Sequence, residues 1–369
     1  MQSRVILINP RYRVWSPSKW VPLGLGYIAA VLEKEGCTVE IIDLSAEKVS
    51  DKELQRQVGN ADIVGINGII TEFQEVLKLV KLVKEAKGNI KIILGGPLAT
   101  TLTKELLEVS SADVIVLGEG EKTIVNLLSA INENSDFNNV RGIAYKDGNQ
   151  IIITEKPDHI TDLDSIPFPS RHLLNMNQYL QNHFENIGIQ IKDSKQIRST
   201  NLITSRGCPF GCTFCFKDMW GSDWRARSPE NIIEEMMLLH EKYGVNGFFF
   251  NDDTFVLDSK RVFKFCQLLK SKGLDVVWDC NGRVNLMTKE LLEAMHDAGC
   301  RSIAYGIESG NQVILDSIKK SITLEQIRKV VKWTKDAGIH TTGYFMIGMI
   351  GETKDTIRQT FTFAKELNL

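Results

Sequence analysis

The chain has 369 residues, enough for two domains with hydrophobic cores. Its 44 Lys and Arg residues against 46 Asp and Glu residues leave a net charge of −2, so no global basic field favours nucleic acid or an anionic membrane as a partner. No stretch approaches the roughly 20 apolar residues of a transmembrane helix, and the N-terminus lacks the features of a signal peptide. We therefore expect a cytoplasmic protein that has no transmembrane segment and binds no nucleic acid.

Residues 1–135 alternate short runs rich in Val and Ile with amphipathic helical patterns, which gives five βα repeats. The near-continuous apolar strands predict a doubly wound, flavodoxin-like parallel sheet. Ligands of such sheets bind at the carboxyl ends of the strands. Glycine there lets a bulky ligand approach the backbone. The candidate ligand contacts at these ends are Gly68, Gly95, Gly96, Gly118 and Glu119.

Residues 136–195 contain a hairpin pattern around Asp147–Gly148 and then a proline-containing polar stretch, which we interpret as a connector. A second series of βα repeats occupies residues 196–369 and predicts a partial (β/α)6 barrel. Only five strand-like runs can be counted there, and a helical pattern from Glu352 to Leu369 ends the sequence. We therefore expect a fragment or a shortened barrel whose last strand, within residues 341–348, has an open and adhesive edge.

The seven cysteines fall into two groups. Cys37, Cys266, Cys280 and Cys300 lie in apolar segments and are expected to be small buried residues. The other three form the spacing Cys208-x3-Cys212-x2-Cys215 on a loop that follows the first strand of the second series. Three thiolates on one loop can hold three irons of a [4Fe–4S] cube and leave the fourth iron open. A structural zinc site is the alternative, although it commonly needs four ligands, and no fourth Cys or His lies nearby.

This cysteine spacing, with the aromatic Phe214 before the last cysteine, resembles the radical S-adenosylmethionine (SAM) superfamily. The resemblance covers residues 200–369 and implies that the open iron binds the amino and carboxylate groups of SAM. It also implies that the reduced cluster cleaves SAM to methionine and a 5′-deoxyadenosyl radical, with Phe214 near the adenine.

Further motifs at successive strand ends extend this resemblance. The resemblance makes Asn251, Asp252 and Asp253 candidate contacts for the SAM amino group, and it makes Glu308 a candidate contact for the ribose or the aminocarboxylate. Each feature has an ordinary alternative: the two aspartates can cap the next helix, and Arg283 can pair with Glu308 across the barrel mouth. Arg283 itself, at the barrel mouth, is a further candidate of this group. The last two are Gly343 and Gly348, in a motif that ends at Glu352 and that the resemblance places beside the adenine.

The segments PLGLGYIAAVLEKEGCTVEIID, ILGGP and VLGEGE resemble the cobalamin-binding domain that is fused to many radical SAM enzymes. The Asp-x-His-x-x-Gly motif of methionine synthase-type domains is missing, since no His precedes His159. The resemblance therefore implies cobalamin without a histidine of this domain on cobalt. A doubly wound domain for another ligand, or for none, remains the alternative.

Together these resemblances imply a radical SAM enzyme that transfers a methyl group to an unactivated carbon of a small-molecule or natural-product substrate. Its cofactors would be a [4Fe–4S] cluster, SAM and cobalamin, and its reductant would be an electron donor such as flavodoxin or ferredoxin. Radical cyclisation or rearrangement and a non-catalytic cobalamin- or iron–sulfur-binding fragment are the alternatives. The substrate itself is not predicted by the sequence.

Overall fold

A computed structural model describes residues 3–11, 19–190 and 197–369 of the chain. The chain forms two compact units, each with its own core. Unit 1 comprises Met1–Tyr179 together with the short segment Asp218–Trp220, and unit 2 comprises Leu180–Lys217 and Gly221–Leu369.

Unit 1 is built on a seven-stranded sheet with the order β2-β1-β3-β4-β5-β6-β7. The first five strands pair in parallel, and their order is that of a flavodoxin-like doubly wound sheet, as predicted. The strands are β1 (Arg4–Asn9), β2 (Thr38–Asp43), β3 (Ile63–Ile66), β4 (Lys91–Leu94), β5 (Val114–Val116), β6 (Ile143–Asp147) and β7 (Gln150–Ile153).

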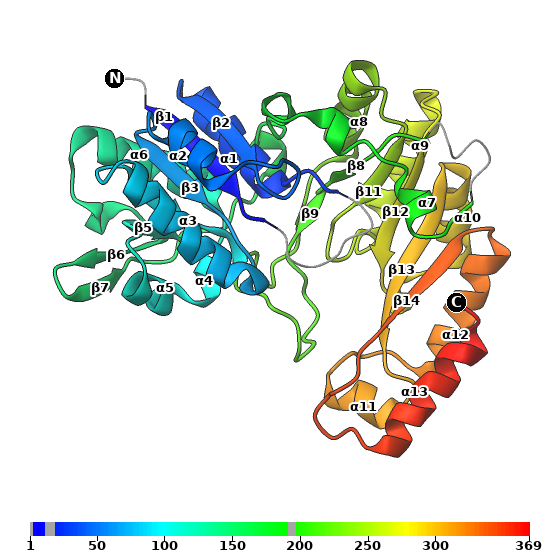
Figure 1. Cartoon of the computed structure of the whole chain (residues 1–369). Helices are drawn as coiled ribbons and strands as arrows, with labels where there is room; N and C mark the ends of the chain where they lie inside the picture. The colour runs from blue at the N-terminus through cyan, green and yellow to red at the C-terminus, as the bar shows by residue number, and fades with distance from the viewer. Residues whose placement is uncertain (1–2, 12–18, 191–196) are drawn as a thin grey trace. The chain divides into compact units, whose positions relative to one another are not determined.

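Helices cover both faces of this sheet (Figure 1). Val5 and Leu7 of β1 pack with α1 and α6, whereas Ile6 and Ile8 pack with α2 to α5. Strands that are covered on both faces need continuous apolar runs, which explains the Val- and Ile-rich pattern. The helices are α1 (Leu23–Lys34), α2 (Asp51–Val58), α3 (Phe73–Ala86), α4 (Gly96–Thr101), α5 (Thr103–Val109) and α6 (Gly120–Glu133).

The hairpin β6–β7 belongs to this sheet and not to a connector. Val116 of β5 pairs antiparallel with Ile143, and Tyr145 is buried in the same core as α1 and α6. Further on, the Tyr179 hydroxyl donates a 2.6 Å hydrogen bond to buried Asp43 at the end of β2. Unit 1 therefore extends to Tyr179, whereas the sequence placed the domain boundary at residue 135.

Unit 2 contains a parallel five-stranded sheet with the order β14-β13-β12-β11-β8, the partial barrel that was predicted. Its strands are β8 (Ser199–Leu202), β11 (Gly247–Phe250), β12 (Val277–Gly282), β13 (Cys300–Glu308) and β14 (His340–Phe345). The helices are α7 (His183–Asn186), α8 (Pro229–Tyr243), α9 (Ser259–Ser271), α10 (Lys289–Asp297), α11 (Gln312–Ser317), α12 (Leu324–Asp336) and α13 (Lys354–Leu367).

An aromatic cluster forms the centre of the core between this sheet and its helices. Phe250, Phe255, Phe265 and Trp278 contact one another with ring centroids 4.6–5.8 Å apart. The thiols of Cys266, Cys280 and Cys300 are buried in the same core, which confirms their predicted role as small apolar residues, and Cys37 packs partly buried in unit 1.

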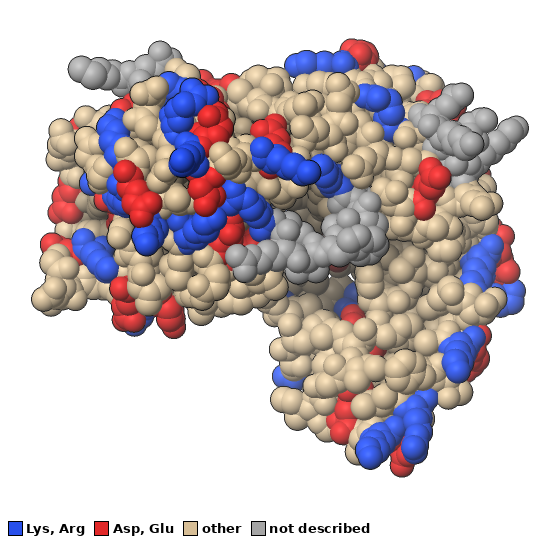
Figure 2. Space-filling view, in the orientation of Figure 1, with Lys and Arg blue, Asp and Glu red and all other residues tan. Residues whose placement is uncertain are grey.

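Charged side chains of both signs are interspersed on the face shown in Figure 2. Such mixing keeps the long-range field over this face small. Among the helices of the described residues, none is long and apolar enough to cross a bilayer.

Candidate active site

The loop that follows β8 carries the three clustered cysteines. It starts and ends in a short antiparallel ribbon, in which β9 (Ser205–Arg206) pairs with β10 (Arg225–Ala226). Inside the loop the Lys217 ammonium donates to the carbonyls of Cys208, at 3.0 Å, and of Phe210. The loop is thus folded back on itself, with Cys212 buried, Cys208 half-buried and Cys215 exposed.

Two further cations approach Cys212. The Nη1 of Arg283 lies 3.6 Å from the Cys212 Sγ, and its guanidinium stacks 3.9 Å from the ring centroid of Phe210. A hydrogen bond with the Cys215 thiol, together with Arg283 and the Lys320 ammonium, lowers the pKa of Cys212 to about 5. Cationic surroundings favour the thiolate, which is the form that binds metal.

The Glu308 carboxylate does not pair with Arg283. Its Oε1 lies 2.7 Å from Lys320 Nζ, and both side chains are buried. Glu308 has a φ of +68°, an uncommon conformation for a non-glycine residue, and a Cβ on Gly306 would lie within 2.7 Å of both charged groups. Backbone strain of this kind often marks a functional site. No sequence pattern points to Lys320, because it follows α11 in a turn that is distant in sequence from any strand end.

The three candidates after β11 have different environments. Asp252 is fully buried and is bonded within the protein, whereas Asp253 is exposed. Desolvation of its carboxyl group and the Asp252 charge raise the pKa of Asp253, and Lys217 opposes that shift. The expected alternative of a helix cap is not realised, because Asp258 caps α9. Asn251 continues the strand with a 2.7 Å bond from its N–H to the Leu202 carbonyl.

Phe214 and the two glycines of the last motif also lie in unit 2. Phe214 packs partly buried against the core, with the Lys320 ammonium 5.7 Å from its ring centroid. Gly343 serves packing, since a Cβ there would collide with Leu369. Gly348 has a φ of +102° and donates its N–H to Glu352, so it forms a glycine-requiring turn.

The cysteine loop suits an iron–sulfur cube better than a single metal ion. The described residues include no group of three or more His, Cys, Asp or Glu side chains that could hold one metal ion. In a cube each thiolate binds its own iron, so the thiolates need not surround one point. The three thiols lie near the cations of Arg283, Lys217 and Lys320. These positive charges would compensate the negative charge of a cluster bound by three thiolates.

At the carboxyl edge of the unit 1 sheet, glycines leave the backbone open. A Cβ on Gly95 would meet nothing within 4 Å, and Gly96, with a φ of +82°, lies against the backbone of Gly68. Gly118 has a φ of +65°. Beside them the buried Asn67 Oδ1 accepts no hydrogen bond from any described residue. Exposed glycine backbone leaves room for a large ligand, and the Asn67 Oδ1 can accept a hydrogen bond from it. Both features fit a ligand with amide donors, such as cobalamin.

Glu119, a predicted cofactor contact, has partners within the protein. Its carboxylate is buried, accepts a 2.9 Å hydrogen bond from the Ile160 N–H, and lies 3.7 Å from His159 Nδ1. These contacts tie the chain beyond the hairpin to the sheet edge.

Asp218–Trp220 also contributes to this edge of unit 1. The Thr100 hydroxyl donates to the Met219 sulfur at 3.3 Å and accepts from the Gly118 N–H at 3.1 Å. Asp218–Trp220 therefore packs at the glycine-rich edge of the unit 1 sheet and is part of that unit, although it lies within the cysteine loop in the sequence.

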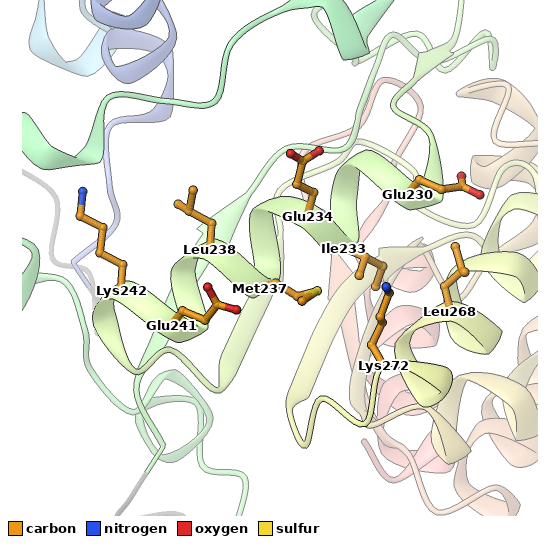
Figure 3. Close-up of a pocket in the computed structure, with 9 residues that line it drawn as sticks. All are labelled: Glu230, Ile233, Glu234, Met237, Leu238, Glu241, Lys242, Leu268 and Lys272. Carbon is orange, nitrogen blue, oxygen red and sulfur yellow. The ribbon is translucent and has the colours of Figure 1, made fainter.

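A groove of about 720 Å³ lies elsewhere, on the outer side of α8 and α9 (Figure 3). Its floor is apolar, with Ile233, Met237 and Leu268, and its rim carries Glu230 and Glu234 among other charges. None of the residues discussed above lines it, so it is separate from the cysteine loop.

Comparison with known proteins decides the family. The sequence profile of the radical SAM superfamily matches residues 202–364, and that of the B12 binding domain matches residues 13–128. An uncharacterized methyltransferase of Pyrococcus horikoshii, PH0819, is 34% identical over 94% of this chain and 74% of its own length. The chain belongs to the cobalamin-binding radical SAM enzymes.

Two other relatives are similar over nearly the whole chain. The cytidylyl-2-hydroxyethylphosphonate methyltransferase of Streptomyces wedmorensis is 30% identical over 98% of this chain and 77% of its own length. The anaerobic magnesium-protoporphyrin IX monomethyl ester cyclase of Rubrivivax gelatinosus is 30% identical over 99% of this chain and 66% of its own length. The names of these relatives thus cover both methyl transfer and cyclisation.

The fold agrees with this assignment. The solved structure of the cobalamin-dependent SAM radical enzyme OxsB superimposes with a TM-score of 0.84 at 20% identity, covering 98% of this chain and 52% of OxsB. The cofactors of a radical SAM enzyme with a B12 binding domain are a [4Fe–4S] cluster, SAM and cobalamin. The cysteine loop fits the first of these, and the glycine-rich edge of unit 1 fits the last.

Proposed function

We propose that this radical SAM enzyme transfers a methyl group from SAM, through cobalamin, to an unactivated carbon of a small molecule. The proposal rests on the presence of two features in one chain. One is a cysteine loop within the radical SAM match, and the other is a glycine-rich sheet edge within the B12 binding domain match. The similarity of 34% to a methyltransferase over most of both chains supports it. The cluster with SAM supplies a 5′-deoxyadenosyl radical, and cobalamin supplies the methyl group.

The chain's own residues bind and orient these groups. Cys208, Cys212 and Cys215 hold the cluster, and the Arg283 and Lys320 cations compensate its negative charge. The buried, strained Glu308 presents its carboxylate for a hydroxyl or ammonium group of SAM.

The inner face of the barrel sheet is the proposed binding surface for the substrate. Register places Asn201, Phe249, Asp279 and Ser302 side by side on the face opposite the helix-covered core. Below them His183 of α7 bonds Asp279 at 2.9 Å. The three polar side chains of this row, Asn201, Asp279 and Ser302, suit a substrate with hydrogen-bonding groups.

Radical cyclisation is the second candidate, because the magnesium-protoporphyrin cyclase matches 99% of this chain. The two reactions differ in their products from SAM. Methyl transfer yields S-adenosylhomocysteine as well as 5′-deoxyadenosine, whereas cyclisation or rearrangement yields 5′-deoxyadenosine alone.

The test uses the full chain, reconstituted anaerobically with iron, sulfide and cobalamin and reduced with dithionite or a flavodoxin system. Formation of S-adenosylhomocysteine that requires cobalamin supports methyl transfer. Formation of 5′-deoxyadenosine alone, with and without cobalamin, contradicts it and favours the cyclase alternative. Comparing the two reductants also tests the proposed electron donor.

A further inference from the structure

The cysteine loop is closed by a narrow neck. Ser205 and Arg206 of β9 pair antiparallel with Ala226 and Arg225 of β10, and residues 207–224 between them carry all three cysteines. Loops gain precision when their ends are fixed by buried contacts. The contacts that hold this β9–β10 neck together therefore determine how precisely the three cysteines are positioned.

The Asp252 carboxylate fastens one side of this neck. Its Oδ1 accepts a 2.6 Å hydrogen bond from the Thr204 N–H, and its Oδ2 accepts from the Thr204 and Ser205 hydroxyls, both at 2.6 Å. The side chain has no exposed surface, so a cofactor cannot reach it. Burying a carboxylate is costly unless several donors and a countercharge compensate it.

Arg261 of α9 is linked to Asp252 through the Thr204 hydroxyl, which brings its positive charge near the carboxylate. Its Nη2 donates to the Thr204 hydroxyl at 2.6 Å and to the Thr204 carbonyl at 2.9 Å, and its Nε donates to the Arg227 carbonyl at 2.9 Å. The Thr204 hydroxyl thus accepts from Arg261 and donates to Asp252. Because Thr204 precedes β9 and Arg227 follows β10, the Arg261 side chain holds both ends of the neck.

We propose that Asp252 is a positioning residue which, with Thr204 and Arg261, forms the cysteine loop before the cluster is inserted. Asp252 is therefore not a SAM contact, and of the two aspartates only the exposed Asp253 stays a candidate for that contact. The same neck serves methyl transfer and cyclisation alike, so this inference does not depend on which reaction the enzyme catalyses.

Hydrogen–deuterium exchange of the full apo chain tests the clamp without any cofactor. Asp252→Asn keeps the size of the side chain but replaces the oxygen that accepts from two hydroxyls with a donor. We expect exchange in residues 203–227 to speed up at least tenfold, while peptides from residues 19–179 are unchanged. Asp253→Asn is the matched control and should exchange like the unaltered protein. Equal exchange in both variants, or faster exchange throughout the chain, overturns the proposal.

Variants of Thr204 supply the second measurement. Thr204→Ser keeps the hydroxyl relay and should retain iron and the electron paramagnetic resonance signal of the reduced cluster. Thr204→Val removes the relay and should lower bound iron several-fold and change the signal of the residual cluster. This arm also decides the matter if Asp252→Asn does not fold. An unchanged cluster signal in Thr204→Val, with full iron, would show that the neck clamp does not position the loop.

Discussion

The ammonium of Lys320 lies 2.7 Å from the carboxylate of Glu308, at the carboxyl end of β13. Both side chains are less than one-tenth exposed, and the ammonium also contributes to the low pKa of Cys212. One lysine thus connects the candidate SAM contact with the cluster ligands. Arg283 supports it by donating a hydrogen bond to the Lys320 carbonyl.

Replacing Lys320 with Met should destabilise unit 2 strongly. The change leaves the Glu308 carboxylate buried without its partner, which typically costs about 3–5 kcal/mol. Urea unfolding measures this loss, and SAM binding to the reconstituted protein should weaken in parallel. The control is Lys319→Met, an exposed neighbour, for which we expect a change within about 0.5 kcal/mol. Equal effects of the two substitutions would show that the ion pair contributes nothing.

Changing Cys208, Cys212 or Cys215 to Ala should each remove most of the bound iron and all production of 5′-deoxyadenosine. Three thiolates are needed because a [4Fe–4S] cube that leaves one iron open has three other irons, each of which takes one thiolate. Iron analysis after anaerobic reconstitution measures the effect. Cys266→Ser is the control, since that thiol is buried in the helix-covered core and should leave the cluster intact. Full iron occupancy in Cys212→Ala would contradict the assignment of these cysteines as cluster ligands.

Cobalamin bound to unit 1 should carry no protein histidine on cobalt. No His occurs before His159, and His159 itself lies beside the Glu119 carboxylate. Electron paramagnetic resonance of the Co(II) form checks this expectation, with isotope labelling to identify the cofactor's own base. Nitrogen splitting that follows labelling of the protein's histidines would contradict it.

Glu72→Gln should stabilise the protein at neutral pH but not in acid. Burial, together with the Asp43 and Glu75 charges, raises the pKa of the Glu72 carboxyl in the folded state. The unfolded chain therefore releases this proton first, so the cost of burying the charge is absent below about pH 4.3 and grows as the pH rises through the folded-state pKa. Gln keeps an acceptor for the 2.9 Å bond from the Ile69 N–H. Melting temperatures of both proteins at pH 4 and pH 7 give the test, and a gain of equal size at both would rule out this explanation.

Local pattern was enough to predict much of the fold. The Val- and Ile-rich runs predicted the five parallel strands of unit 1, because strands buried on both faces need continuous apolar residues. In unit 2 the regular alternation of short apolar runs with helical patterns predicted the five strands. The position of the cysteine loop followed as well, since a loop after a parallel strand opens at the carboxyl edge. The hairpin at residues 143–153 was misplaced because its pattern does not show which sheet edge it joins.

The sequence alone determined which residue types stand at each strand end, and thus the family chemistry of the cysteine loop. Only the tertiary structure separated Asp252, which clamps the neck, from Asp253, which is exposed one residue later. It also assigned Glu119 to the Ile160 backbone and brought Lys320 to Glu308. The physical reason is that a charged side chain takes its role from its burial and its partners, and for Asp252 the partner Thr204 is 48 positions away in the sequence.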